Sequence, residues 1–296
     1  MKSKTPKAFT NLAIFETWLS RFIIAILSLQ IVVLAQHTFA WRYGEDVGFF
    51  YYFSWLINEN EYRPYIDIHE TSFPGSFLLY SLITRISGYS VLAYNITHIF
   101  IFGTFCTASF FALRKINPRM AIAATCMFGS MYFFMHRSIH MQRDFLVLVF
   151  IVFALATMTS RVKLHWRAAV TGVLFGIAST IKPHAAMAAP FIVLFGALTE
   201  SPNQKKHFFM ATSVSLCGFF LVWVVVIGCL VANGSWPYFY SMVSEYLPIY
   251  QKMNGMHFAQ SDEQRLSNAI SWLQGTLLAG IIPTSIGLAF TLLNTS

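Results

Sequence analysis

The sequence has 296 residues, of which 56% are hydrophobic and only 11% charged. Because a soluble domain carries about 25% charged residues, these proportions exclude an ordinary soluble domain and predict an all-α, polytopic membrane protein. The formal net charge of +8 is explained by Lys and Arg in cytoplasmic loops, and no basic run interleaved with aromatic residues indicates nucleic-acid binding.

Apolar segments predict about eight transmembrane helices. In chain order they cover about 14–36, 91–113, 120–137, 144–160, 168–181, 184–198, 208–232 and 271–293. Arg21 precedes the apolar core of the first segment, which favours an uncleaved span over a signal peptide. The short segments 168–181 and 184–198 meet at Lys182-Pro183-His184 and predict a pair of half-length helices, because proline breaks a helix.

The charged residues predict the orientation. With the N-terminus in the cytoplasm, more than half of the 20 Lys and Arg fall in cytoplasmic segments, and most of the 12 Asp and Glu fall on the other side. We therefore expect one integral-membrane module over 1–296, with its N-terminus in the cytoplasm and outer loops at about 37–90 and 233–270. The second loop is rich in aromatic residues and is either an interfacial belt or a surface on which a sugar stacks.

The first outer loop opens with Glu45 and Asp46, followed by an aromatic run from Val47 to Ile57. Phe49, Tyr52, Phe53 and Leu56 have helical spacing and predict an amphipathic helix at the membrane interface. One interpretation is that Glu45 or Asp46 caps this helix. The other is that Asp46 is a functional carboxylate.

A second acidic cluster follows in the same loop. Asp67, His69 and Glu70 come just before an apolar segment, 73–87, that predicts another interfacial helix. Two acidic clusters at the starts of neighbouring helices predict a shared polar cavity. Carboxylate oxygens suit a divalent metal, Mg or Mn, at Asp46 and Glu70.

Two further polar motifs interrupt the apolar segments. Gln142-Arg143-Asp144 stands immediately before 144–160, where Arg143 is either an anchor at headgroup level or a phosphate-binding guanidinium. Lys182 lies between two apolar segments and needs a partner or a polar cavity. A carboxylate with nearby cations fits group transfer, since a base can take a hydroxyl proton and cations can stabilise a departing phosphate.

In their order and predicted sidedness, these motifs resemble those of the GT-C class of membrane glycosyltransferases, which includes protein O-mannosyltransferases and lipid A aminoarabinose transferases. The resemblance covers about residues 10–235. It is carried by EDVGFFY at 45–51, YIDIHETSFP at 65–74, QRD at 142–144 and KPH at 182–184. Family members usually continue well past their seventh span, so we expect a compact enzyme, one that needs a partner, or a truncated product.

The resemblance implies inverting, single-displacement transfer of a sugar from a polyprenyl-phosphate donor to a glycan, lipid or protein acceptor on the outer face of a bacterial inner membrane. It implies that Asp46 is the catalytic base and that Glu70 and Asp144 are the supporting acids. It also places the donor phosphate near Arg143, Lys182 and His184, and we expect Tyr65 and His69 to contact substrate. The alternatives are a flippase or transporter of lipid-linked sugars and a noncatalytic membrane subunit.

Overall fold

The structure is a computed structural model that describes residues 7–40, 42–198, 204–253, 266–267 and 270, with backbone alone at 7–16, 45, 204–205 and 251–253. The described residues form helices and loops, with no strand and one isolated bridge between Pro64 and Ile68. The all-α prediction is therefore confirmed. The chain divides into two compact units, Met1–Trp236 and Pro237–Ser296. The predicted span 271–293 lies outside the described residues.

The first unit consists of helices joined by short connections. In order they are α1 (Lys7–Thr38), α2 (Glu45–Asn60), α3 (Pro74–Ser87), α4 (Val91–Leu113), α5 (Pro118–Phe134), the 3₁₀ helix η1 (Arg137–Ile139), α6 (Arg143–Met158), α7 (Leu164–Ile181), the 3₁₀ helix η2 (Pro183–Ala188), α8 (Ala189–Leu198) and α9 (Gln204–Ala232). Several starts follow from local chemistry. Ser90 and Asn117 accept backbone hydrogen bonds as N-caps of α4 and α5, and Pro74 and Pro118 occupy first-turn positions.

Among the described residues, four helical stretches are long and apolar enough to cross a membrane: Thr17–Thr38, Val91–Leu113, Leu164–Ile181 and Lys206–Ala232. They support four of the predicted spans. Helices α5 and α6 have 17 and 16 residues, fewer than the roughly 20 that a span needs. The prediction of a half-length helix at 168–181 is wrong, because α7 has 18 residues. The second member is short as predicted, since η2 and α8 share the segment.

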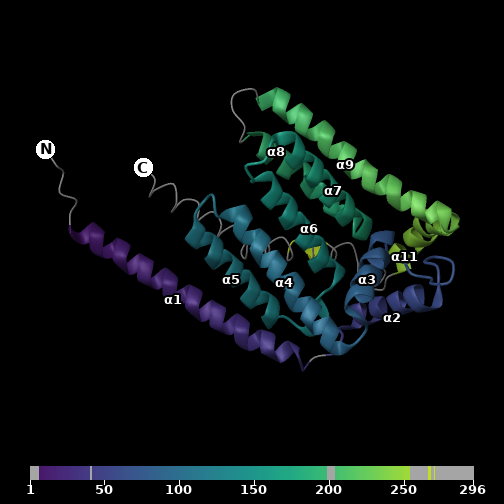
Figure 1. Ribbon diagram of the computed structural model, residues 1–296, viewed down its shortest axis with the longest axis horizontal. Coiled ribbons are helices and arrows are strands. Elements are labelled where there is room, and N and C mark those ends of the chain that lie inside the picture. Colours follow the sequence, from purple (N-terminus) through teal and green to yellow (C-terminus); the bar gives the residue numbers. More distant parts are fainter. Residues whose placement is uncertain (1–6, 41, 199–203, 254–265, 268–269, 271–296) are drawn as a thin grey trace. The chain divides into compact units, whose positions relative to one another are not determined.

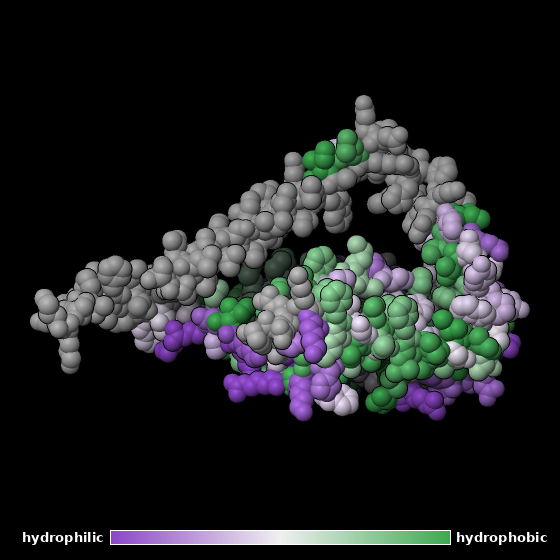
Figure 2. Space-filling model, turned by 90° about the horizontal axis from the view of Figure 1, so that it is seen from above, coloured by the Kyte–Doolittle hydropathy of each residue, from purple (hydrophilic) through white to green (hydrophobic). Residues whose placement is uncertain are grey.

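Large apolar side chains remain exposed on these helices. Phe22, Phe100 and Phe220 are 62%, 70% and 59% exposed, and hydrophobic residues cover much of the coloured surface in Figure 2. Scattered exposed apolar residues are ordinary on a soluble protein, but this many large ones on long helices are compatible with contact with lipid.

Helices α4 to α7 run side by side, with α1 along α5 and α9 along α7 (Figure 1). Because the chain reverses at each short connection, its loops gather at two ends of this unit. We call the end that contains residues 39–90, 135–142 and 182 the acidic end. The end that contains residues 114–117 and 159–163 is the basic end. Asp46, Glu70 and Asp144 lie at the former, and Arg114, Lys115 and Arg161 at the latter.

Glycine allows the close approach of α3 to the last turn of α7. A Cβ atom added to Gly75 would lie 2.2 Å from Thr180 Oγ1 and 2.6 Å from the Thr180 carbonyl carbon, a separation that no larger residue tolerates. Ser76 Oγ also donates to the Ile181 carbonyl, at 3.5 Å. This contact holds the first-loop segment beside Lys182, which follows α7 directly.

Helix α2 packs on α3 through a face that was not predicted from the sequence. Val47, Phe50, Tyr51 and Ser54 are buried, and the Phe50 ring stacks on Tyr80 at a centroid distance of 4.9 Å. By contrast, Phe49 and Tyr52, from the predicted apolar face, are 61% and 55% exposed. The helix itself is confirmed, and it presents aromatic side chains outward as an interfacial helix would.

The second unit is helical where it is described. It contains most of α10 (Trp236–Ser241), a π-helical turn η3 (Met242–Tyr246) and α11 (Leu247–Met253). Tyr238, Tyr240 and Tyr246 are 53%, 62% and 55% exposed. The aromatic residues predicted to form a belt or a sugar-stacking surface are therefore at the surface of this unit.

Candidate active site

Three consecutive residues before and at the start of α6 connect distant parts of the chain. Gln142 Nε2 donates a hydrogen bond to Asp46 Oδ2 at 3.3 Å, and Arg143 Nη1 donates to Ser72 Oγ at 2.5 Å. Lys182 Nζ forms an ion pair with Asp144 Oδ1 at 2.5 Å. Residues 142–144 thus join α2, the segment before α3 and the end of α7, and bring together all four motifs singled out in the sequence.

Asp46 presents its carboxylate at the acidic end from the first turn of α2, where the helix dipole favours a negative charge. The side chain is exposed. The N-cap of α2 is Gly44, which makes no side-chain hydrogen bond, so the prediction that Glu45 or Asp46 caps the helix is wrong. Glu45 is the first residue of α2, and its side chain is outside the described part of the structure. A Cβ atom on Gly44 would lie 2.9 Å from the Arg137 carbonyl oxygen, so glycine lets Asp46 approach Gln142.

Arg143 is half-buried and held from two sides. Its Ser72 partner donates in turn to Glu70 Oε1 at 3.1 Å, and Thr71 Oγ1 donates to the same oxygen at 3.3 Å. The Arg143 guanidinium also lies 4.8 Å from the centroid of the Phe50 ring, a cation–π contact. Because the Ser72 bond uses one of five guanidinium N–H donors, this arrangement fixes the cation and leaves it able to bind an anion.

Lys182 ends α7 with an extended backbone conformation (φ −140°, ψ 110°). Its side chain is 24% exposed, whereas that of its partner Asp144 is 61% exposed. A largely buried ammonium is unfavourable without a counter-charge, and the Asp144 carboxylate supplies one. Asp144 also lies in the first turn of α6, where the helix dipole favours its negative charge.

Three tyrosines hold the backbone just before this polar cluster. Tyr80 OH donates to the Met141 carbonyl at 2.5 Å, Tyr94 OH donates to the His140 carbonyl at 3.3 Å, and Tyr132 OH accepts from Met141 N at 3.2 Å. Met141 has a positive φ of 59°, which is uncommon for a residue other than glycine. Burial raises the pKa of Tyr80 well above its usual value, so its hydroxyl remains a donor. We call Tyr80, Tyr94 and Tyr132 the tyrosine cradle.

The tyrosine cradle was not predicted from the sequence, because its members lie on three different helices, α3, α4 and α5. No local spacing connects them. The available signal was a weak one, the presence of one tyrosine on each helix near the end where the polar motifs were expected. The hydrogen bonds to residues 140 and 141 become visible only in the folded chain.

The other predicted site residues have different surroundings. Tyr65 is buried, its hydroxyl donates to the Ser72 carbonyl at 2.7 Å, and burial raises its pKa. It therefore shapes the turn that presents Ser72. His69 and His184 are exposed at the acidic end. Asp67 accepts a hydrogen bond from Arg63 N at 2.8 Å, and this bond lowers the pKa of its carboxyl group.

The predicted metal site gains no third ligand. The part of the chain that the structure describes contains no group of three or more His, Cys, Asp and Glu side chains placed to hold a metal ion. Asp46 contacts Gln142, and Glu70 contacts Ser72 and Thr71. Positive charge in this cluster comes from Arg143 and Lys182, and a metal at Asp46 and Glu70 stays a prediction.

Comparisons with protein-family models, with curated proteins and with solved structures found no significant match to this chain.

Proposed function

We propose that this protein is a membrane glycosyltransferase that moves a sugar from a polyprenyl-phosphate donor to a glycan, lipid or protein acceptor. The observation that carries the proposal is the set of contacts made by residues 142–144. They gather one exposed carboxylate, Asp46, and two cations, Arg143 and Lys182, at the same end of the fold. These are the groups that displacement of a phosphate by a hydroxyl requires.

In the proposed reaction, Asp46 takes the proton of the acceptor hydroxyl as the acceptor oxygen forms a bond to the anomeric carbon of the sugar. The bond between that carbon and the donor phosphate oxygen breaks, and its electron pair stays on the departing polyprenyl phosphate. Arg143 and Lys182 stabilise the charge that develops there. The amide of Gln142 orients the Asp46 carboxylate through their hydrogen bond. A single displacement of this kind inverts the configuration of the anomeric carbon.

Glu70 and Asp144 act as positioning residues in this proposal. Glu70 holds the Ser72 hydroxyl that binds Arg143, and Asp144 holds the ammonium group of Lys182. Both cations are thereby fixed before the donor arrives, which lowers the cost of organising the site during the reaction. The exposed side chains of His69 and His184 are available to contact the sugar or the phosphate.

The exposed aromatic side of α2 supports a lipid-linked donor. Phe49, Tyr52 and Trp55 are 61%, 55% and 42% exposed on the helix that begins beside Asp46. Aromatic side chains favour the membrane–water interface. In the proposed arrangement they hold Asp46 at the depth of the donor phosphate, on the outer face of a bacterial inner membrane.

The test is sugar transfer by the purified full chain in detergent, with a panel of radiolabelled polyprenyl-phosphate sugars and polar, lipid and peptide acceptors. We expect labelled product and released polyprenyl phosphate from the wild type. The same preparation in vesicles reports on the flippase alternative, through translocation of the labelled lipid. Translocation without transfer from any donor would overturn the proposal in favour of a transporter, and neither activity would favour a noncatalytic subunit.

A further inference from the structure

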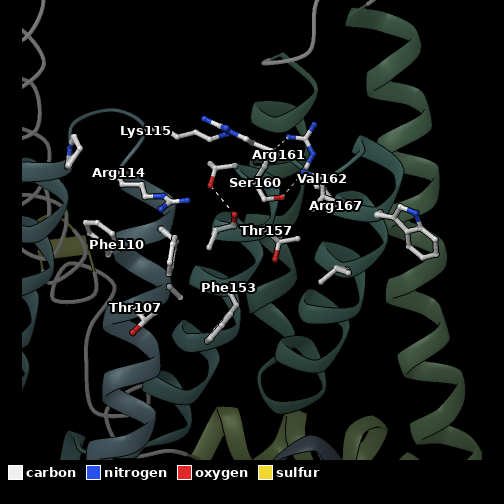
Figure 3. A pocket seen from close by; sticks show the side chains of 17 residues that line it. Thr107, Phe110, Arg114, Lys115, Phe153, Thr157, Ser160, Arg161, Val162 and Arg167 are labelled. Atoms are coloured by element: carbon white, nitrogen blue, oxygen red, sulfur yellow. Dashed lines mark hydrogen bonds between the residues drawn. The ribbon is translucent and has the colours of Figure 1, made fainter.

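A cavity of about 1370 Å³ lies at the basic end, far along α4, α6 and α7 from the candidate active site. Its walls come from the C-terminal part of α4, from α6 and the loop that follows it, and from the start of α7. Figure 3 shows Arg114 and Lys115 on the α4 side, with Arg161 and Arg167 on the side of the α6–α7 loop. None of the catalytic or positioning residues described above lines this cavity.

All the charged side chains that line the cavity are cationic. Arg114, Lys115, Arg161 and Arg167 line it, and the described lining residues include no Asp or Glu. Arg114, Lys115 and Arg161 are exposed, so these cations are accessible to a ligand. At the acidic end, by contrast, Lys182 is paired with a carboxylate at 2.5 Å. Three exposed cations around a hollow without a carboxylate favour an anionic occupant.

Arg167 gives the cavity a fixed edge. This guanidinium is only 4% exposed, and its Nη1 donates to the carbonyls of Met158 at 2.8 Å and Ser160 at 3.3 Å. These carbonyls close the C-terminal end of α6, so Arg167 holds the loop that carries Arg161. The Arg114 guanidinium lies 4.3 Å from the centroid of the Phe111 ring. This cation–π contact orients Arg114.

Large apolar side chains also line the cavity. Phe111, Phe153, Trp166 and Val170 line the cavity and are 43%, 37%, 61% and 44% exposed. In Figure 3 Phe153 lies further along the helices than the cationic groups. A small anion would bind the cationic side chains and leave this apolar surface uncovered. An amphiphile with an anionic head and a hydrocarbon chain would contact both the cationic and the apolar side chains.

The position of the cations along the helices agrees with a lipid. Arg114 and Lys115 follow the last residue of α4, and Arg161 and Lys163 precede α7. Both helices are long and apolar enough to cross a membrane. The ends of such helices lie at the level of lipid headgroups, where basic pockets between helices bind anionic heads.

From this combination we infer that the cavity between α4, α6 and α7 is a binding site for a phosphate-bearing membrane lipid. The headgroup phosphate binds Arg114, Lys115 and Arg161, and a hydrocarbon chain lies along Phe111, Phe153 and Trp166. The inference is independent of sugar transfer. It assigns to the basic end a ligand that the acidic end does not share.

The experiment counts the lipids retained by the full chain after release from nanodiscs that contain equal amounts of phosphatidylglycerol and phosphatidylcholine, measured by native mass spectrometry. We expect the wild type to retain phosphatidylglycerol preferentially. We expect Arg114→Gln/Lys115→Gln/Arg161→Gln to retain about tenfold less of it, because each cation near the headgroup contributes to binding. Arg114→Lys/Arg161→Lys keeps the charge and should keep most of the retention, which separates loss of the site from loss of the fold.

The matched control removes the same charge elsewhere. Arg42→Gln/Arg85→Gln/Arg137→Gln changes three exposed arginines outside the cavity and should retain phosphatidylglycerol as the wild type does. Equal retention of the two lipids by the wild type, or an equal loss in the control, would overturn the inference. If added inorganic phosphate abolished the retention of phosphatidylglycerol, the cavity would be assigned to a soluble phosphate compound. That result would also overturn the inference.

Discussion

The two ends of the first unit use charge in opposite ways. At the acidic end, charged and polar side chains are hydrogen-bonded or ion-paired with one another: Gln142 with Asp46, Arg143 with Ser72, Ser72 with Glu70, and Lys182 with Asp144. At the basic end, Arg114, Lys115 and Arg161 surround a large cavity whose described lining holds no carboxylate. A paired network fixes groups in place for a reaction, whereas unbalanced charge around a hollow suits the binding of an anion.

This contrast predicts that variants at the two ends have separable effects. Changes at the acidic end should reduce sugar transfer and leave lipid retention unchanged. Changes at the basic end should reduce lipid retention and leave transfer largely intact.

Apart from the loss of the Asp46 carboxylate, the largest effect is expected from Arg143. Arg143→Gln should lower the rate of sugar transfer about 10²–10³-fold, because it removes the cation held between Ser72 and Phe50 that stabilises the departing phosphate. Arg143→Lys should recover part of the rate, since it restores the charge without the planar guanidinium. Arg85→Gln, an exposed arginine of α3, is the control. Equal losses at Arg143 and Arg85 would mean that general charge, and not this site, supports transfer.

Gly75→Ala tests whether the acidic end depends on the approach of α3 to α7. The added Cβ atom meets Thr180 Oγ1 at 2.2 Å, and overpacking of this kind costs about 1–3 kcal/mol. We expect a lower melting temperature in detergent together with slower transfer. Gly103→Ala is the matched control, because a Cβ atom there meets no atom within 4 Å. Wild-type stability of Gly75→Ala would show that the two helices lie further apart.

Tyr80→Phe tests the tyrosine cradle. It removes the hydrogen bond to the Met141 carbonyl and should destabilise the fold by about 1 kcal/mol, as loss of a buried hydrogen bond does. Slower transfer should accompany this loss, because residues 142–144 follow directly. Tyr52→Phe changes a tyrosine that is 55% exposed and should behave as the wild type in both thermal unfolding and transfer.

The smallest effect on stability is expected from the ion pair at the end of α7. A double-mutant cycle with Asp144→Asn and Lys182→Gln should give a coupling energy of about 0.2–1 kcal/mol in thermal unfolding, because Asp144 is 61% exposed and water screens the pair. The same cycle measured on transfer should show strong non-additivity if Asp144 acts through Lys182. Additive losses in transfer would mean that the two residues work independently.

Much of the helical framework could be predicted from hydrophobicity. The segment predicted at 91–113 coincides with α4, and that at 73–87 differs from α3 by one residue. The start of α7 was missed because Arg167 does not match an apolar segment. In the fold Arg167 is buried and satisfied by the Met158 and Ser160 carbonyls, and hydropathy does not register such compensation.

For the candidate site, the residues could be predicted from the sequence but their contacts could not. Asp46, Glu70, Asp144, Arg143 and Lys182 could be selected because charged residues are rare beside apolar segments. Their specific partners could not, because the contacts span separations of 96, 71 and 38 residues.

The face of α2 that packs on α3 could not be predicted, for another reason. The helix carries aromatic residues around its circumference, so spacing alone did not distinguish the face that packs on α3 from the face that remains exposed. The basic cavity was missed because a general excess of Lys and Arg already accounted for its cations.

The role of Asp46 as the base that removes the acceptor proton is tested most directly by comparing Asp46→Asn with Asp67→Asn in the same transfer assay. Both substitutions remove one carboxylate charge from the first loop, but the Asp67 carboxylate is hydrogen-bonded to Arg63 N and not to the residues of the site. We predict that Asp46→Asn lowers transfer about 10²–10⁴-fold, with retention of the polyprenyl-phosphate donor unchanged, and that Asp67→Asn transfers at close to the wild-type rate. Undiminished transfer by Asp46→Asn would contradict the account.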